Sequence, residues 1–150
     1  MKEGIVLFFK NKDNESNFIK IGEEIGQEVI KLYCQKKDVS FDNTSELERQ
    51  IISIYLFGLL DGIRQNKYSD LTPLQVKKCL SHILESVLGY SLNQANDFTE
   101  NMISNLQNGN PQNTIYAIIH RGLDGYFMWI KNKKDEIVND IYSIVGLLQS

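Results

Sequence analysis

The sequence predicts an all-α fold, a single-domain bundle of about six helices with two apolar helices at its centre. Three observations support this class. Apolar residues recur at three- and four-residue steps along most of the chain, capping signals stand where that pattern restarts, and the 150 residues include only two prolines. A chain of this length is the size of one ordinary domain, so we expect residues 1–150 to share one core.

The first predicted helix begins near Phe18, after a polar stretch at residues 11–17. Its apolar stripe is Phe18, Ile21, Ile25, Val29, Leu32 and Tyr33, and its polar face is Glu23, Glu24, Gln27, Glu28 and Lys31. Before it, residues 5–9 form the apolar run IVLFF, for which a short strand, a helix and a docked arm all remain open. The run is too short to span a membrane, which needs ~20 apolar residues, and no signal-peptide cleavage site follows it.

The second predicted helix starts at a capping box. Ser45 and Glu48 have the S-x-x-E spacing in which each side chain satisfies the other residue's backbone amide. Residues 51–63 then read IISIYLFGLLDGI, which is apolar on all sides. An all-round apolar helix is typical of a buried, central position.

The third and fourth helices also begin at caps and end at glycine. Residues 72–75, TPLQ, combine a capping threonine, a proline at the first helical position and a glutamine that can reach back. That helix ends at Gly89. Ser91 and Gln94 start the next one, and residues 108–111, NGNP, end it.

The fifth predicted helix, residues 114–130, is again apolar on most sides, and the basic stretch at residues 131–134 ends it. A final amphipathic helix carries its apolar stripe at Ile137, Ile141, Ile144, Val145 and Leu148. We therefore expect the second and fifth helices at the centre and the others around them.

Glycines within the helices need a compensating reason, because a helix-interior glycine costs roughly 1 kcal/mol relative to alanine. Gly58 and Gly62 are four residues apart on one helix face, as are Gly22 and Gly26. This spacing favours close packing of helix backbones. A bent helix at a binding or catalytic site is the alternative.

Each of the two apolar helices contains one aspartate, within the sequence Leu-Asp-Gly in both cases. Asp61 has Arg64 three residues on, whereas Asp124 has Arg121 three residues back and His120 four back. These spacings place each partner on the same helix face, and a buried aspartate needs such a partner. The pattern favours a polar network that holds the two helices in register. The alternatives are a polar cleft that grips a partner or ligand, and catalysis by Asp61, His120 and Asp124.

Several function classes find little support. The formal net charge is -3, whereas a nucleic-acid binder normally needs a basic excess. No catalytic triad, phosphate loop or metal motif is present, and His82-x-x-Glu85 is the reverse of the order used in di-metal bundles. We expect no catalytic residue, cofactor or metal, and no membrane contact. Cys34 and Cys79 are predicted to be free thiols in the cytoplasm.

Two segments together resemble a known family. IYLFGLLDGI at residues 54–63 and NTIYAIIHRGLDGYF at residues 113–127 are similar to a YxFGxxD-like helix and an HRGxDGY-like helix. The second motif, from His120 to Tyr126, is the more specific. Both are found in the forty-eighth family of bacterial polymorphic-toxin immunity proteins, and the similarity covers residues 46–129.

The resemblance implies a non-enzymatic, cytoplasmic protein that binds a cognate toxin and neutralises it by occlusion. Because both motifs look buried, we expect the toxin to contact exposed acidic residues, namely Glu23, Glu24 and Glu28. Such a face suits a basic toxin through electrostatic steering. The alternatives are a helical adaptor or chaperone for a secreted effector, and the enzyme with a polar cleft named above. The oligomeric state is open.

Overall fold

The computed structural model describes residues 2–110 and 112–149, with side chains from residue 12 onward. Within these residues the chain forms helices and no strand. The six α-helices are α1 (Lys2–Lys37), α2 (Glu46–Lys67), α3 (Pro73–Leu88), α4 (Leu92–Asn108), α5 (Thr114–Ile130) and α6 (Lys134–Gln149), and a short 3-10 turn, η1 (Phe41–Asn43), precedes α2. The all-α prediction is confirmed.

Local hydrogen bonds set the helix boundaries that the sequence predicted. The capping boxes at Ser45, Thr72 and Ser91 are formed at the starts of α2, α3 and α4, with both reciprocal bonds present in each. Gly89 and Gly109 end α3 and α4 with φ values of 70° and 52°. These left-handed conformations are the ones that favour glycine after a helix.

The start of α1 differs from the prediction. Helix runs continuously from residue 2, so the strand and arm alternatives for residues 2–9 are wrong, and the polar stretch at residues 11–17 is helical as well. Polar contacts explain the polar stretch. The Asn14 amide donates to the Asp70 carboxylate at 3.0 Å, and the Gln75 amide donates to the Glu15 carboxylate at 3.1 Å. The stretch therefore packs beside the α2–α3 loop and the start of α3.

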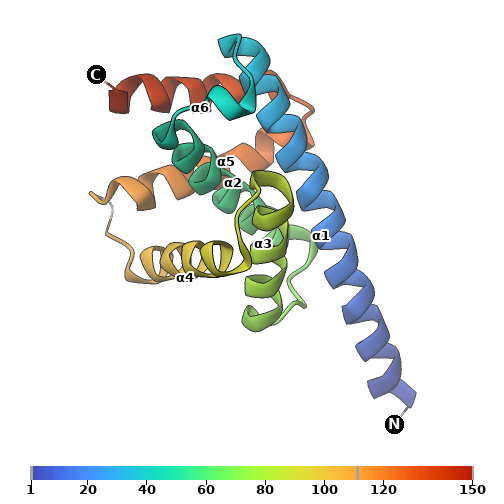
Figure 1. The fold of residues 1–150 in the computed structure, drawn as a ribbon. Coiled ribbons are helices and arrows are strands. Elements are labelled where there is room, and N and C mark those ends of the chain that lie inside the picture. The colour runs from blue at the N-terminus through green and yellow to red at the C-terminus, as the bar shows by residue number, and fades with distance from the viewer. Residues whose placement is uncertain (1, 111, 150) are drawn as a thin grey trace.

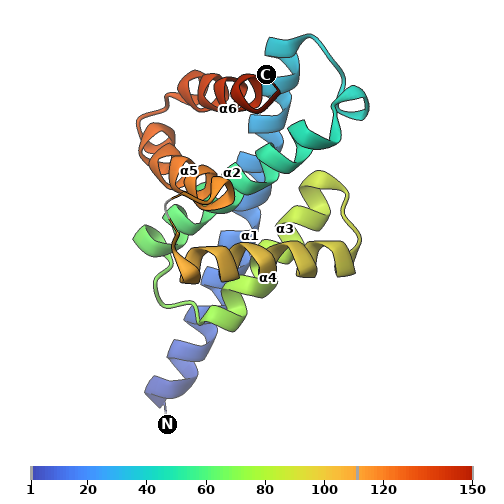
Figure 2. The same ribbon diagram turned by 90° about the vertical axis from the view of Figure 1, so that its left-hand side faces the viewer.

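Helix α2 lies at the centre and packs against each of the other five helices in the described part of the chain. Figures 1 and 2 show α1 running along one side of the bundle, with its N-terminal end extending beyond the other helices. Helices α3 and α4 lie together on one side of α2, and α5 and α6 lie together on another. One hydrophobic cluster joins residues of all six helices.

Helix α5 was also predicted to be central. It packs directly on α2, but its buried residues are confined to one face: Ile118, Ile119, Gly122, Gly125 and Tyr126. The opposite face is exposed, which matters for the site below. None of the described helices has both the length and the apolar character needed to cross a membrane.

Candidate functional site

The crossing of α2 and α5 is built on glycine. A Cβ atom on Gly58 would overlap the carbonyl oxygen of Ile119, and one on Gly122 would overlap the carbonyl oxygen of Tyr55. Farther along, a Cβ on Gly62 would lie 2.8 Å from the Cβ of Tyr126. The close-packing interpretation of the glycine pairs is confirmed here. It also holds for Gly22 and Gly26 of α1, whose added Cβ atoms would crowd the side chains of Ile83 and Val87 on α3.

The motif from His120 to Tyr126 is divided between two faces of α5. Gly122, Gly125 and Tyr126 are buried, and each faces α2. By contrast, His120, Arg121 and Asp124 are exposed. The expectation that the whole motif is buried is therefore wrong. Its inner half makes the helix crossing, and its outer half is accessible to a partner.

The predicted polar network forms only in part. The buried Asp61 carboxylate accepts a hydrogen bond from Arg64 Nε at 2.9 Å and another from the Gln65 amide at 2.8 Å. Nothing corresponding is found at Asp124, which is exposed. No network therefore joins α2 to α5 through these two carboxylates, and the glycines set the helix contact instead.

The partners expected for Asp124 are engaged elsewhere. Arg121 forms an ion pair with Asp140 of α6, donating from both Nε and Nη2. The His120 ring lies against the Tyr116 ring, with centroids 4.4 Å apart. Helix spacing alone allowed an Arg121–Asp124 pair, but the tertiary fold gives Arg121 a carboxylate on the neighbouring helix.

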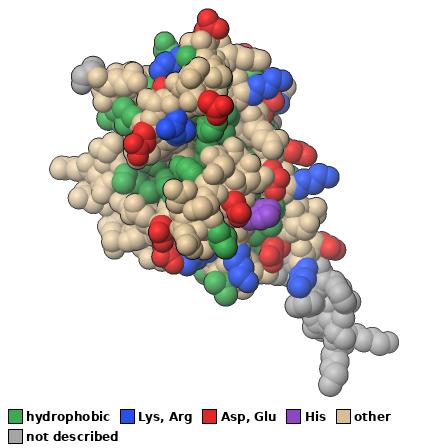
Figure 3. All heavy atoms as spheres, viewed as in Figure 1, with side chains coloured by type: hydrophobic (Ala, Val, Ile, Leu, Met, Phe, Trp, Pro, Cys, Tyr) green, Lys and Arg blue, Asp and Glu red, His purple; other side chains and the backbone are tan. Residues whose placement is uncertain are grey.

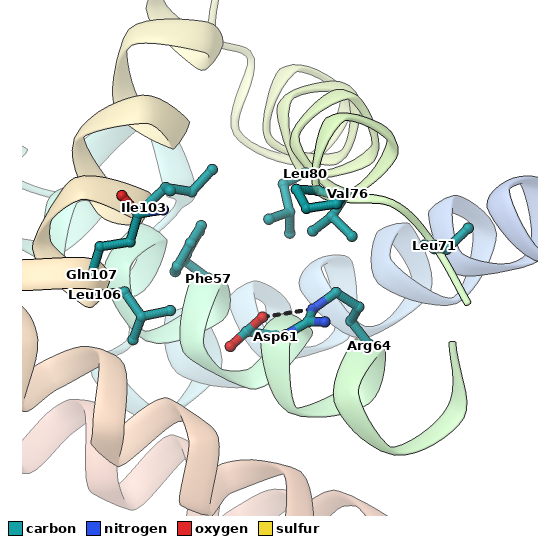
Figure 4. A pocket seen from close by; sticks show the side chains of 10 residues that line it. Phe57, Asp61, Arg64, Leu71, Val76, Leu80, Ile103, Leu106 and Gln107 are labelled. Carbon is teal, nitrogen blue, oxygen red and sulfur yellow. Dashed lines mark hydrogen bonds and ion pairs between the residues drawn. The ribbon is translucent and has the colours of Figure 1, made fainter. Parts of the chain in front are cut away.

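Asp61 lies at the wall of a cavity of about 260 Å³ between α2, α3 and α4. In Figure 4 the Asp61–Arg64 pair is beside Phe57, with Val76 and Leu80 on one side and Ile103 and Leu106 on the other. Neither His120 nor Asp124 lines this cavity. The convergence of Asp61, His120 and Asp124 expected for a catalytic cleft is thus not formed.

A second buried carboxylate was missed by the sequence reasoning. Glu48, only 3% exposed, accepts from the Tyr33 hydroxyl at 2.5 Å, from Lys37 Nζ at 2.8 Å and from the Ser45 amide at 2.9 Å. Burial alone would raise the pKa of Glu48, but the hydrogen bonds from Lys37, Tyr33 and Ser45 lower it to about 2. The sequence feature related to this cluster is the four-residue spacing of Tyr33 and Lys37, which places both donors on one face of α1. This cluster ties α1 to the start of α2.

The acidic residues of α1 that were expected to bind a partner differ in accessibility. Glu24 is exposed, whereas Glu23 is half-buried and lies 3.4 Å from His82 Nε2. Glu28 is half-buried and lines a shallow pocket shared with Lys133 and Lys134. Acidic and basic side chains are interspersed over the face seen in Figure 3. Of the three, Glu24 offers the most accessible negative charge.

An apolar groove lies between α5 and α6, and the exposed residues His120, Asp124 and Phe127 are outside its lining. Phe127 is 53% exposed, and it follows His120 and Asp124 along the same helix face. The groove holds about 230 Å³ and is lined by Ala117, Ile118 and Arg121 of α5 and by Ile144, Leu147 and Leu148 of α6, among others. Leu147 is 70% exposed. We define the α5–α6 surface as His120, Arg121, Asp124, Phe127, Leu147 and Leu148.

The aromatic run near the end of α5 is split in the same way. Tyr126 is buried against α2, Trp129 is half-buried under the ammonium group of Lys134, and Phe127 projects outward. Large aromatic rings at accessible positions are common anchors of protein interfaces. Phe127 therefore strengthens the case for the α5–α6 surface as a contact site.

In the part of the chain that the structure describes, the side chains do not form a metal site or a reactive thiol site. There, no three His, Cys, Asp or Glu side chains gather as a potential metal site. Cys34 and Cys79 are both free. Burial raises the pKa of the Cys79 thiol to about 12, which disfavours the reactive thiolate form.

Comparison with family models identifies a family to which the chain is similar. The family model described as Immunity protein 48 matches residues 25–149, which include part of α1 and all of α2 to α6. The matched region extends beyond the expected residues 46–129 at both ends. No curated protein and no solved structure gives a significant match.

Proposed function

The chain belongs to the Immunity protein 48 family, and from that membership we propose that it binds a cognate bacterial toxin and neutralises it by occlusion, without chemistry of its own. The protein acts in the cytoplasm of the cell it protects. Its partner is a toxin protein, and no cofactor takes part.

The structural observation that supports a partner-binding role is the exposed outer half of the α5 motif. The contact with α2 is made by the glycines and by Tyr126. The side chains of His120, Asp124 and Phe127 are exposed and are therefore available to a partner. The neighbouring groove adds exposed apolar area at Leu147 and Leu148. Aromatic and apolar anchors beside hydrogen-bonding groups are the usual composition of an interface core.

The proposed contact places Phe127 at the centre, with His120 and Asp124 as polar neighbours. A stable complex of ordinary size covers about 800 Å² on each partner, which is more than one helix face supplies. The contact therefore includes α6 through the Arg121–Asp140 pair and Leu147.

The acidic side of α1 is the proposed second contact region, with Glu24 as its most accessible residue and Glu23 and Glu28 beside it. Its role is electrostatic steering of a basic toxin, which changes the rate of association more than the final affinity. The two regions make different predictions: substitutions on α5 change dissociation, and those on α1 change association.

The test is co-expression with the toxin genes that neighbour this one. Rescue of growth together with a stable one-to-one complex is the expected result. Binding without rescue would favour an adaptor or chaperone for a secreted effector. Neither binding nor rescue with any toxin candidate would contradict the proposal and return attention to an enzymatic role for the Asp61 cavity.

Substitutions on α5 test whether the toxin binds at the α5–α6 surface. Phe127→Ala is expected to weaken toxin binding at least tenfold, a loss of about 1.4 kcal/mol or more, because an aromatic anchor is removed. The matched control is Leu92→Ala on α4, since Leu92 is equally apolar and 57% exposed but remote in sequence and absent from the α5–α6 groove. Circular dichroism of both variants checks that the fold is retained.

A further inference from the structure

The cavity between α2, α3 and α4 has the size and chemistry of a small binding site. Its volume is about 260 Å³. An apolar cavity of ~150 Å³ already accommodates benzene in a protein interior. The space is therefore sufficient for one aromatic ring with a substituent, or for a bicyclic ring.

Most of the wall is apolar. Phe57, Leu71, Val76 and Leu80 are buried side chains that line it, and Ile103 and Leu106 of α4 complete it. These residues offer dispersion contacts and no hydrogen bonds. A ligand that fits must be mainly hydrocarbon.

The polar part of the wall is the neutral Asp61–Arg64 pair together with the amide side chain of Gln107. Arg64 lies 2.9 Å from the Asp61 carboxylate, so the two charges compensate and a charged ligand gains little. A carboxylate has roughly four acceptor sites, and Arg64 and Gln65 account for two hydrogen bonds to it. Asp61 can therefore accept a further hydrogen bond from a ligand. The guanidinium group of Arg64 in addition attracts the face of an aromatic ring, which an aliphatic ligand does not provide.

We propose that this cavity binds a single neutral aromatic group that carries a hydrogen-bond donor, a phenol or an indole, with Asp61 accepting from the donor. The site is separate from the α5–α6 surface and does not depend on the toxin-binding role. A free aromatic metabolite and a tyrosine or tryptophan side chain of a protein partner present this same chemistry.

The test uses p-cresol, indole and toluene as probes, with amide chemical shifts followed by NMR. The expected result is saturable shifts in residues around the cavity, with p-cresol binding at least as tightly as toluene. A purely apolar cavity gives the reverse order, because the hydroxyl group is then left without a partner. Absence of saturable binding by all three probes, or shifts confined to other regions, would overturn the proposal.

Two variants test the two halves of the site. Asp61→Asn is expected to weaken p-cresol about tenfold while leaving toluene unchanged, since a hydrogen bond to a charged acceptor becomes a weaker neutral one. Val76→Phe fills the cavity from the α3 side and should abolish binding of all probes. Leu74→Phe is the control on the same helix, because Leu74 is 64% exposed and does not line the cavity. Equal loss of p-cresol and toluene in Asp61→Asn would overturn the role of Asp61.

The affinity of the Val76→Phe variant for the toxin that the protein binds distinguishes the two sources of the aromatic group. A toxin affinity that falls with the variant assigns the cavity to a toxin side chain. An unchanged toxin affinity, with p-cresol binding lost, assigns it to a free small molecule. Both outcomes retain the site, and the first would add a toxin contact at the α2–α3–α4 cavity to the one proposed at the α5–α6 surface.

Discussion

Gly58 and Gly122 meet face to face where α2 crosses α5, with so little space that an added Cβ on either one would overlap backbone atoms of the other helix. The obstacle on each side is a carbonyl group, of Ile119 facing Gly58 and of Tyr55 facing Gly122. Backbone atoms cannot rotate away as a side chain can. The glycine pair therefore fixes the separation of the two helices, and with it the orientation in which α5 presents its outer face.

Substitution of Gly58 by alanine is expected to destabilise the protein by about 3 kcal/mol. In an unconstrained helix the same change stabilises, by about 1 kcal/mol, because glycine has the greater backbone freedom in the unfolded chain. At Gly58 the steric cost outweighs this gain, since α2 and α5 must move apart. Urea denaturation followed by circular dichroism measures the change.

Gly146→Ala is the matched control for that substitution. Gly146 lies in α6, is exposed, and an added Cβ would meet no heavy atom within 4 Å. Here alanine should raise the unfolding free energy by about 0.5–1 kcal/mol. Opposite signs for the two substitutions are the expected pattern, and a neutral or stabilising Gly58→Ala would refute the close crossing.

Glu48 predicts an acid-sensitive contribution to stability. Its pKa is about 2 in the folded protein, against an ordinary value of 4.5. A lowered folded-state pKa means that the contribution is complete above pH ~5 and is lost as the pH falls toward 2. The size follows from the pKa difference and is roughly 3 kcal/mol. Urea unfolding at pH 7, 5 and 3 should show the decline.

Glu48→Gln isolates this effect, because glutamine preserves the capping box with Ser45 while removing the charge that Lys37 neutralises. The variant should be less stable than the wild type at pH 7, and the gap should narrow toward pH 3. Glu46→Gln, at an exposed position in the same helical turn, should change stability by less than about 0.5 kcal/mol. A constant gap across pH would show that Glu48 acts through packing alone.

The sequence predicted most of the fold because most helix boundaries are local. The caps at Ser45, Thr72 and Ser91 each depend on residues three positions apart, and Gly89 and Gly109 end their helices by their own backbone freedom. The start of α1 was missed because its polar residues are held by distant partners. Asn14 bonds to Asp70, 56 residues away, and no periodic pattern records such a contact.

The site was predictable only in part, for the same reason. Spacing identified Asp61 with Arg64, but it equally suggested Arg121 with Asp124, and the fold instead pairs Arg121 with Asp140 of another helix. An apolar composition suggested that α5 is central and that its motif is buried, whereas the outer side of the motif and the adjacent Phe127 are exposed. Which apolar face of a helix is left uncovered depends on its neighbours, and the main contacts of α5 are with α2, α4 and α6.

Asp61→Ala and Asp124→Ala should have unequal effects on stability, although both residues belong to a Leu-Asp-Gly segment. Asp61 is 4% exposed and paired with Arg64, so its removal is expected to cost about 2 kcal/mol, less than for a fully buried pair because water can reach Arg64. Asp124 is exposed, so its removal should change the unfolding free energy by less than about 0.5 kcal/mol. Chemical denaturation of the two variants measures both changes in unfolding free energy. Equal losses of stability would mean that Asp124 is buried.

Glu24→Lys should slow association with a basic toxin without preventing it. Because Glu24 is exposed on α1, reversal of its charge weakens long-range attraction and leaves the α5–α6 surface intact. Stopped-flow or surface-plasmon measurements should show an association rate several-fold lower at low salt. The difference should disappear near 1 M salt, where screening extends over only about 3 Å.

Asp97→Lys on α4 carries the same change of charge at another exposed position and separates a local effect from one of net charge. If both variants slow association equally, the overall charge of the protein is responsible and the acidic side of α1 has no special role. If only Glu24→Lys does so, the toxin approaches along α1. An association rate unchanged by either substitution would remove Glu23, Glu24 and Glu28 from the contact and leave α5 with α6 as the whole of the proposed interface.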